Sequence, residues 1–403
     1  MSKVFKRCFA TTTKNMNGFN HHPSTSFGCI DIHTHVYLSR YVEMLKTRNE
    51  IPKIVINGLN DDNYSMLLPS ETVRSIDSEC WVLEDRLAFM ETHNISHSFI
   101  SLPNPWIQFI DNKYECDIFT RLLNDDLQNE YCERSKNKLF GYGILPTTST
   151  IHACCREIEH IATNLKSIKG VIIGTNGLNG LDIFDRQLIE VYKTIEEYGL
   201  FIMIHPHYDG LKYGSIMTRF ILNGILDDCP NLNIILAHCN DALPYICDTL
   251  TNIVNNEDSE DSELIKTNKE PIKYLTENNI YYDAFTDNTL ELESAINLVG
   301  VNKILFGTDN GYSSPMNSNH NHLHINGSNG INGINGTSKV NGINGANGIH
   351  NTNGYTVANG KNGANSVNGT NGINGANGIN STISHDVKRQ ILYENAHNIF
   401  KLI

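Results

Sequence analysis

Two histidines separated by one residue, His33 and His35, lie at the end of an apolar run at residues 28–36. The run is rich in β-branched and other apolar residues and predicts a β-strand. Because alternate residues of a strand point to the same side, both imidazoles leave the strand on one face. Imidazole is the commonest metal-binding side chain, so the pair is half of a potential metal site. Taken alone, it fits equally well two hydrogen-bonded polar side chains at a strand end.

Three more candidate residues lie at the ends of later apolar runs: His205, His238 and Asp309. Histidine nitrogens and a carboxylate form a mixed nitrogen and oxygen set that suits zinc, with iron, cobalt or manganese as alternatives. A second metal would need a bridging anionic ligand. The run at 168–176 ends in Gly-Thr-Asn and offers no lysine or acid for that purpose. We therefore expect one divalent ion.

Eight short apolar runs alternate with helical patterns along the chain. The predicted strands are residues 28–36, 97–104, 139–146, 168–176, 200–207, 233–239, 280–285 and 303–310. The predicted helices are residues 82–94, 117–136, 151–165, 185–198, 217–228, 241–255, 288–299 and 386–400. Apolar strands separated by helices indicate a parallel sheet buried on both faces. Eight such units predict an α/β fold of the (β/α)8 TIM-barrel type rather than an open doubly wound sheet.

The predicted barrel brings the five candidate residues to one rim, because barrel active sites lie at the C-terminal ends of the strands. A single histidine at a strand end is more often structural than catalytic. Five candidates from four strands on the same rim are a much stronger signal.

The composition limits the class of protein and its partners. The chain has 403 residues, of which 40% are hydrophobic, and can bury a large core. Its formal net charge of −13 argues against nucleic acid or an anionic membrane surface as a general partner. No apolar run approaches the roughly 20 residues of a membrane-spanning helix. The ten cysteines form no CxxC repeat, which favours reduced thiols in an intracellular protein.

The chain divides into three parts. Residues 1–27 are basic, lack acidic residues and are rich in serine and threonine, which fits a mitochondrial transit segment or a disordered extension. Residues 28–316 and 385–403 form the predicted barrel. Residues 317–384 repeat Asn-Gly and offer too little apolar surface to fold, so we expect a disordered insertion after the eighth strand, with a small solenoid as the alternative.

The motifs resemble those of the amidohydrolase-related metal-dependent decarboxylases, which include 2-amino-3-carboxymuconate-6-semialdehyde decarboxylase. The matching segments, in order, are Asp-Ile-His-Thr-His at 31–35, Ile-His-Pro at 204–206, Leu-Ala-His at 236–238 and Phe-Gly-Thr-Asp at 306–309. Within this group the chain is most similar to uracil-5-carboxylate (iso-orotate) decarboxylases. That likeness rests on residues 39–41, 51–52, 101–106, 170–175 and 205–208.

The resemblance implies a role for each candidate residue. His33, His35, His205 and Asp309 would bind the metal. His238 would act as a general acid/base, and Asp309 is also the candidate proton donor to the carbon that loses CO2. Asn104 would hydrogen-bond the substrate ring, unless it is only a turn residue before a proline. Arg219 would hold a carboxylate, unless it is a solvated helix residue. His207 shares a strand face with His205 by its spacing, and the intervening proline favours a place in the pocket wall over a ligand role.

These observations predict a zinc-dependent decarboxylase of a small cyclic or unsaturated carboxylic acid, of the uracil-5-carboxylate or aminocarboxymuconate semialdehyde type. The expected protein is a homodimer in the cytosol or the mitochondrial matrix. One alternative is a hydrolase of an amide or a lactone, which uses the same ligands. The other is a non-catalytic relative. Cys-Asn-Asp follows His238 where the resemblance implies small glycines, and Asn-Gly-Tyr and the Asn-Gly insertion follow Asp309 where it implies a bulky aromatic wall.

Overall fold

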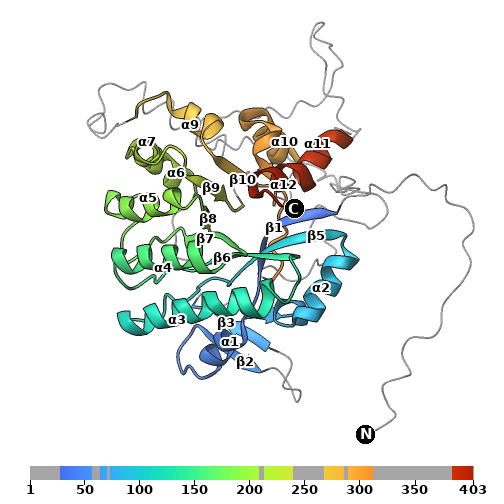
Figure 1. Cartoon of the computed structure of the whole chain (residues 1–403), viewed down its shortest axis with the longest axis vertical. Helices are drawn as coiled ribbons and strands as arrows, with labels where there is room; N and C mark the ends of the chain where they lie inside the picture. Colours follow the sequence, from blue (N-terminus) through green and yellow to red (C-terminus); the bar gives the residue numbers. More distant parts are fainter. Residues whose placement is uncertain are drawn as a thin grey trace, which may run out of the picture.

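The structure, a computed structural model, describes residues 28–56, 64–69, 73–207, 213–238, 267–285, 289–311 and 384–402. Its centre is an eight-stranded sheet in the order β1-β5-β6-β7-β8-β9-β10-β11 (Figure 1). Every neighbouring pair in it is parallel. The strands are β1 (Cys29–His35), β5 (Ile95–Ser101), β6 (Leu139–Gly143), β7 (Ile168–Gly174), β8 (Phe201–His205), β9 (Asn233–Leu236), β10 (Ile280–Asp283) and β11 (Ile304–Leu305). Each overlaps one predicted run, which confirms the parallel sheet.

The segment after β11 returns to β1 and closes the sheet into a barrel. The amide of Ile32 donates to the carbonyl of Phe306 at 2.9 Å, and the amide of Asp309 donates to the carbonyl of His33 at 2.8 Å. A further bond of 2.7 Å joins the amide of His35 to the carbonyl of Asn310. This closure confirms the TIM-barrel prediction and brings the chain around Asp309 beside the two β1 histidines.

Helices cover the outside of the barrel. They are α1 (Ser39–Lys46), α2 (Leu83–Thr92), α3 (Lys113–Asp126), α4 (Ile151–Asn164), α5 (Ile189–Glu197), α6 (Tyr213–Leu222), α7 (Ile225–Asp228), α9 (Pro271–Glu277) and α10 (Thr289–Val299). Helices α3, α4 and α5 lie side by side (Figure 1). The side chain of Asn112 caps α3, and that of Thr150 caps α4. The helix predicted at 241–255 lies outside the described residues, and α1 and α9 were not predicted.

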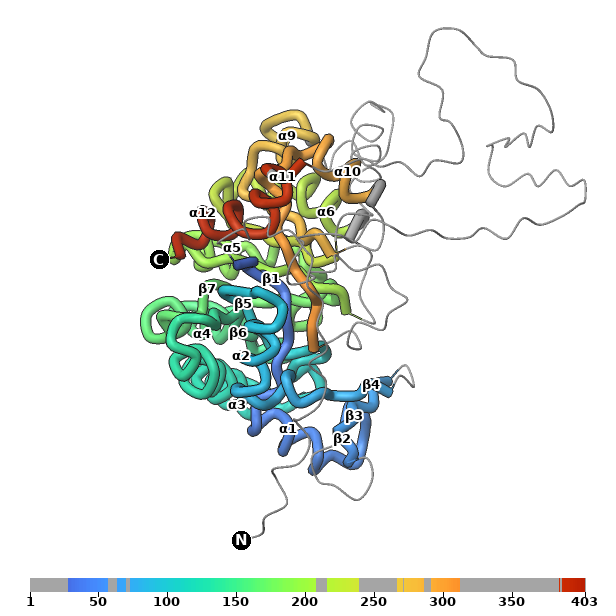
Figure 2. The backbone as a smooth tube through the Cα atoms, turned by 90° about the vertical axis from the view of Figure 1, so that its right-hand side faces the viewer, coloured from blue at the N-terminus to red at the C-terminus, as the bar shows by residue number. Residues whose placement is uncertain are grey.

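A small antiparallel sheet, also not predicted, lies between α1 and α2 in the chain and beside α1 in space (Figure 2). It contains β2 (Lys53–Ile56), β3 (Tyr64–Leu67) and β4 (Val73–Ile76). Along β4, Val73 and Ser75 are exposed while Arg74 and Ile76 are buried. Because this small sheet follows the C-terminal end of β1, it lies on the side of the barrel where active sites form.

The last helical segment packs against the other end of the strands. It runs through α11 (His385–Arg389), a π-helical turn (Gln390–Glu394) and α12 (Asn395–Phe400), as predicted for 386–400. The ring of Phe400 lies 4.1 Å from that of Phe99 and 4.4 Å from that of Phe201. Aromatic packing of this kind stabilises the barrel away from the candidate site.

Several sequence-based predictions fall outside the described residues. They include the leader at 1–27 and the insertion at 317–384, apart from Ser384, whose side chain accepts a hydrogen bond from the amide of Val387 and caps α11. Within the described ranges, no helix has the length and apolar character needed to cross a bilayer. The seven cysteines in those ranges are all free thiols.

Candidate metal centre

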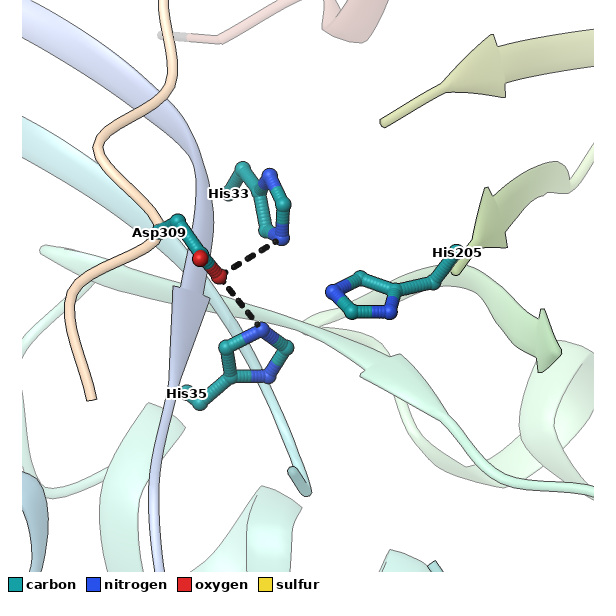
Figure 3. Close-up of side chains that lie close together, drawn as sticks. All are labelled: His33, His35, His205 and Asp309. Atoms are coloured by element: carbon teal, nitrogen blue, oxygen red, sulfur yellow. Dashed lines mark hydrogen bonds and ion pairs between the residues drawn. The ribbon is translucent and has the colours of Figure 1, made fainter. Parts of the chain in front are cut away.

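The two β1 histidines are fully buried where the strand ends. His33 and His35 each have 0% exposure, and every residue of β1 is buried. Their ring centroids lie 5.2 Å apart with the rings nearly perpendicular. As the spacing predicted, both side chains leave the strand on the same side (Figure 3). They form one wall of a polar cluster inside the barrel mouth.

His205, at the end of β8, and Asp309, in the segment after β11, complete the cluster (Figure 3). Asp309 Oδ1 lies 3.3 Å from His33 Nε2 and 3.1 Å from His35 Nε2. The His205 ring, at the end of β8, is centred 5.0 Å from both β1 rings. One ligand atom from each of the four residues lies within 4.8 Å of the others, and all four residues are buried. The structure therefore brings together the four residues predicted as metal ligands.

The outer nitrogen of each imidazole faces a hydrogen-bonding group away from the centre. His33 Nδ1 lies 2.6 Å from Asp283 Oδ2, and His205 Nδ1 lies 2.8 Å from the carbonyl of Pro206. Both oxygens can only accept, so these nitrogens carry the proton and donate it. His35 Nδ1 lies 3.0 Å from the hydroxyl of Ser101. Protonation at Nδ1 leaves the Nε2 lone pair for a ligand, as is usual for metal-binding histidines.

The electrostatics favour neutral rings beside a negative carboxylate. Burial lowers the pKa of His35 to about 4, against the opposing effect of Asp309. Burial, followed by the neighbouring His33 and His35, holds the pKa of His205 well below its usual value. Burial acts to raise the pKa of Asp309, but His33 and the other two neighbouring histidines outweigh it and the pKa is lowered. Two neutral imidazoles beside an ionised carboxylate form a site that attracts a cation.

His33 is the exception among the three rings. Burial lowers its pKa, but the carboxylates of Asp309 and Asp283 outweigh burial and raise it. The same two negative charges favour a cation at this position. Three imidazole nitrogens and one carboxylate oxygen therefore fit a divalent metal ion with a coordination position left for water or substrate.

His238 lies beside this set. It follows β9, and its Nε2 is 3.7 Å from Asp309 Oδ2. Its side chain is 25% exposed, whereas that of Asp309 is 1% exposed. An imidazole that lies against the cluster and is also partly exposed to solvent is suited to proton transfer.

Asp309 and the adjacent His238 have an uncommon backbone conformation. His238 and Asp309 both have a φ of 53°, in the left-handed region that side chains other than glycine seldom adopt. Such residues concentrate at functional sites, where the surrounding structure holds them in place.

Asn104, one of the two predicted substrate-binding residues, is buried beside the cluster. Its Nδ2 donates to the carbonyl of Pro206 at 3.1 Å, the same carbonyl that accepts from His205. Its Oδ1 is buried and has no hydrogen-bond partner among the described residues. Nearby, the Trp106 ring stacks on His207 at 5.9 Å and meets His205 edge-on at 5.9 Å. The unsatisfied acceptor Asn104 Oδ1 therefore belongs to the same short segment as the Trp106 ring, which stacks on His207.

Arg219, the other predicted substrate-binding residue, is exposed on α6. Its guanidinium lies 5.0 Å from the centre of the Phe184 ring. None of the contacts described for Arg219 joins it to the four-residue cluster. Its assignment as a carboxylate-binding residue stays a prediction.

Two residues of the site were missed in the sequence. Asp283 ends β10 and could have been found by the rule that located His205, because it too lies at the C-terminal end of a barrel strand. Arg74 is 9% exposed on β4. Burial is the main cause that lowers the pKa of His35, and the positive charge of Arg74 adds a smaller contribution. The sequence contains no comparable signal for Arg74, because the sheet that carries it was not predicted.

Comparisons with known proteins agree with this fold. A family model described as amidohydrolase matches residues 30–402. The chain is 21% identical over 297 residues to 2-amino-3-carboxymuconate-6-semialdehyde decarboxylase of Dictyostelium discoideum, covering 70% of this chain and 80% of that protein. Among solved structures it is similar to the apo form of IDCase from Metarhizium anisopliae, with a TM-score of 0.64, 26% identity and coverage of 72% and 86%.

A second solved structure shares the fold. It is a dihydroxybenzoic acid decarboxylase from Polaromonas sp. JS666, with a TM-score of 0.61, 19% identity and coverage of 93% of this chain and 97% of that one. That structure contains manganese and the inhibitor 2-nitroresorcinol.

Proposed function

The chain belongs to the amidohydrolase family, and we propose that it is a metal-dependent, non-oxidative decarboxylase of a small cyclic or unsaturated carboxylic acid. The observation that carries the proposal is the pairing of a buried cluster of three histidines and one aspartate with His238, 3.7 Å from Asp309 Oδ2. Relatives with this fold are named as decarboxylases that act on different acids. Their common reaction supports the same chemistry here.

We assign one divalent ion to His33, His35, His205 and Asp309, and we propose zinc. Imidazole nitrogens and a carboxylate oxygen are all suitable zinc ligands, while manganese is the ion in the related dihydroxybenzoic acid decarboxylase. The ion, when bound, supplies positive charge that orients the substrate carboxylate and stabilises negative charge as it develops.

Proton delivery falls to His238 and Asp309. At rest Asp309 is ionised, because the neighbouring histidines lower its pKa. A proton passes from His238 Nε2 to Asp309 Oδ2 and then to the carbon that bears the carboxylate. The bond between that carbon and the carboxylate breaks, and CO2 leaves. A carbon–hydrogen bond thus replaces the carbon–carboxylate bond, with the electron pair of the broken bond left on the ring carbon. The low exposure of Asp309 keeps competing water away from this transfer.

Two side chains are suited to binding the acid. Arg74 is a buried arginine on β4 whose charge makes a small contribution to lowering the pKa of His35, and we propose that it pairs with the substrate carboxylate. Asn104 Oδ1 is a buried acceptor and can accept from a ring N–H. The stacked Trp106 and His207 rings suit a planar substrate. This combination favours a nitrogen heterocycle such as uracil-5-carboxylate over a purely phenolic acid.

The test of this function is CO2 release by the metal-loaded protein from three acids: uracil-5-carboxylate, 2,6-dihydroxybenzoate and 2-amino-3-carboxymuconate-6-semialdehyde. We expect release from uracil-5-carboxylate to be the fastest. Release from one of the other two acids keeps the decarboxylase but overturns the heterocycle preference. Hydrolysis of a lactone or an amide without CO2 release points to the hydrolase alternative, and no turnover of any of these compounds points to a non-catalytic relative.

Replacement of Arg74 by methionine is expected to lower kcat/KM about 30-fold or more, mainly through KM, because loss of a buried charged contact costs about 2–5 kcal/mol. The matched control is Arg219→Met, which removes the exposed arginine on α6. We expect steady-state kinetics on the preferred acid to change less than threefold in that control. A larger loss for Arg219→Met than for Arg74→Met would reverse the assignment.

Other features stay predictions of the sequence. We propose that the protein is a homodimer in the cytosol or the mitochondrial matrix, with a leader at 1–27 and an insertion at 317–384 that lie outside the barrel. Light scattering on the full chain measures the mass of the assembly. Fractionation of cells that express it, followed by sequencing of its N-terminus, locates the protein and identifies any cleavage of the leader.

A further inference from the structure

Asp283 occupies a position that the proposed reaction does not use. It is the last residue of β10 and has 0% exposure. Its Oδ2 lies 2.6 Å from His33 Nδ1, and its Oδ1 accepts from the amide of Phe285 at 3.0 Å. Burying a carboxylate is costly unless hydrogen bonds and charges compensate it, so its placement against a candidate ligand is informative.

The same oxygen also faces the residue assigned to proton transfer. The backbone amide of His238 lies 3.5 Å from Asp283 Oδ2, at the long end of hydrogen-bonding distance. His238 is one of the residues with a φ of 53°. Such a conformation persists only where its surroundings hold it. Asp283 Oδ2 therefore contacts the ring of one site residue and the backbone of another.

Gly307 provides the space that this arrangement needs. A Cβ at position 307 would lie 2.5 Å from Asp283 Oδ1 and 2.7 Å from His33 Cβ. Both distances are shorter than normal van der Waals contacts, so any larger residue would push the carboxylate and the ring apart. The glycine on the neighbouring strand segment thus permits the close contact between Asp283 and His33.

We propose that Asp283 is the positioning residue of this centre, which keeps the proton of His33 on Nδ1 so that Nε2 faces the metal, and which holds the backbone of His238 beside Asp309. The inference rests on the metal site of the proposed function. A carboxylate behind a metal-binding histidine orients the ring and makes its ligating nitrogen more basic. Asp283 acts through the other residues and does not touch the substrate.

The test measures metal affinity in the full chain, separately from turnover. Apo protein is titrated with Zn²⁺ in competition with a chromophoric chelator, for the wild type and for Asp283→Asn. We expect affinity to fall about 10- to 100-fold, as is typical when such a partner is lost. At saturating Zn²⁺ we also expect kcat to fall while KM stays within threefold, because His238 loses its backbone contact.

Two further variants make the result specific. Ser101→Ala removes the neutral partner of His35 Nδ1, and we expect a smaller loss of affinity than for Asp283→Asn. Gly307→Ala changes no charge but forces Asp283 and His33 apart, and we expect it to reproduce the loss of affinity. Wild-type affinity in both Asp283→Asn and Gly307→Ala would overturn the proposal. An equal loss for Ser101→Ala and Asp283→Asn would remove the special role of the carboxylate.

A crystal structure of the zinc-loaded wild type provides a test that needs no variant. We expect His33 to bind zinc through Nε2 while Nδ1 stays on Asp283. Binding through Nδ1 would overturn the proposal. If the wild type binds zinc in this way but releases no CO2 from any acid, the decarboxylase assignment fails and the role of Asp283 stands.

Discussion

Replacement of Asp309 by asparagine is expected to lower kcat for CO2 release at least about a thousand-fold. The asparagine side chain fills nearly the same space but has no negative charge to pair with a metal and cannot carry the transferred proton. Asp309 Oδ1 lies within 3.3 Å of the Nε2 atoms of both His33 and His35, so its charge acts at the centre of the cluster. We also expect the variant to bind Zn²⁺ more weakly than the wild type.

The measurement for Asp309→Asn combines metal analysis with CO2 release at saturating Zn²⁺. Asp31→Asn is the matched control, because Asp31 is equally buried but bonds to Thr308 and to the backbone amide of His33 rather than to a ring nitrogen. Burial raises the pKa of Asp31 to about 7, so the amide replaces a group that is only partly charged at neutral pH. We expect the control to lose much less activity. Wild-type turnover by Asp309→Asn would remove Asp309 from the reaction.

Replacement of His238 by asparagine is expected to lower kcat about 10²- to 10⁴-fold, the usual contribution of a general acid or base. Asparagine is the suitable substitution, because His238 has a φ of 53° and asparagine tolerates the left-handed region better than most residues. Its amide does not titrate near neutral pH, so the limb of the pH profile that belongs to His238 should disappear. Metal content should stay at the wild-type level, since His238 lies outside the four-ligand set.

The measurement for His238→Asn is a kcat–pH profile together with metal analysis of the same sample. His160→Asn is the control, because His160 is a partly exposed helix histidine bonded to Asp125 at 2.8 Å. We expect the control to retain the full profile. Loss of metal from His238→Asn would instead make His238 a ligand, and an unchanged kcat would exclude it as the acid/base.

The barrel and the clustering of the four candidate ligands could be predicted because they depend on local patterns. Each strand is a short apolar run, and the closure of the barrel follows from eight such runs in series. His33, His35, His205 and Asp309 each end a run, so the fold brings them to the same rim without further information. Prediction of the wider site needed contacts between residues distant in the sequence.

Arg74, Asp283 and Asn104 illustrate that limit in different ways. Arg74 lies on a strand of four residues in the small antiparallel sheet. That strand is defined by its hydrogen bonds to β3 rather than by an apolar pattern in its sequence. Asp283 ends a strand as the ligands do, but only the 2.6 Å contact with His33 distinguishes it from a structural aspartate. Asn104 was identified through resemblance. Only the structure shows that its Nδ2 bonds to the carbonyl of Pro206, 102 residues away, and that its Oδ1 has no hydrogen-bond partner among the described residues. Arg219 is exposed on α6, in keeping with the solvated helix residue that was the alternative for it, and its role as a carboxylate-binding residue stays a prediction.

The central claim, that a metal held by the histidine–aspartate cluster is required for decarboxylation, is tested most directly by a metal titration of the full chain. Protein stripped with a chelator is supplied with increasing Zn²⁺, or with Mn²⁺ in a parallel series, and CO2 release from uracil-5-carboxylate is recorded at each step. The account predicts that activity is absent at first, rises in proportion to bound metal and reaches its maximum at about one ion per chain. CO2 release that persists in the stripped protein, or a chain that binds no divalent ion, would contradict it.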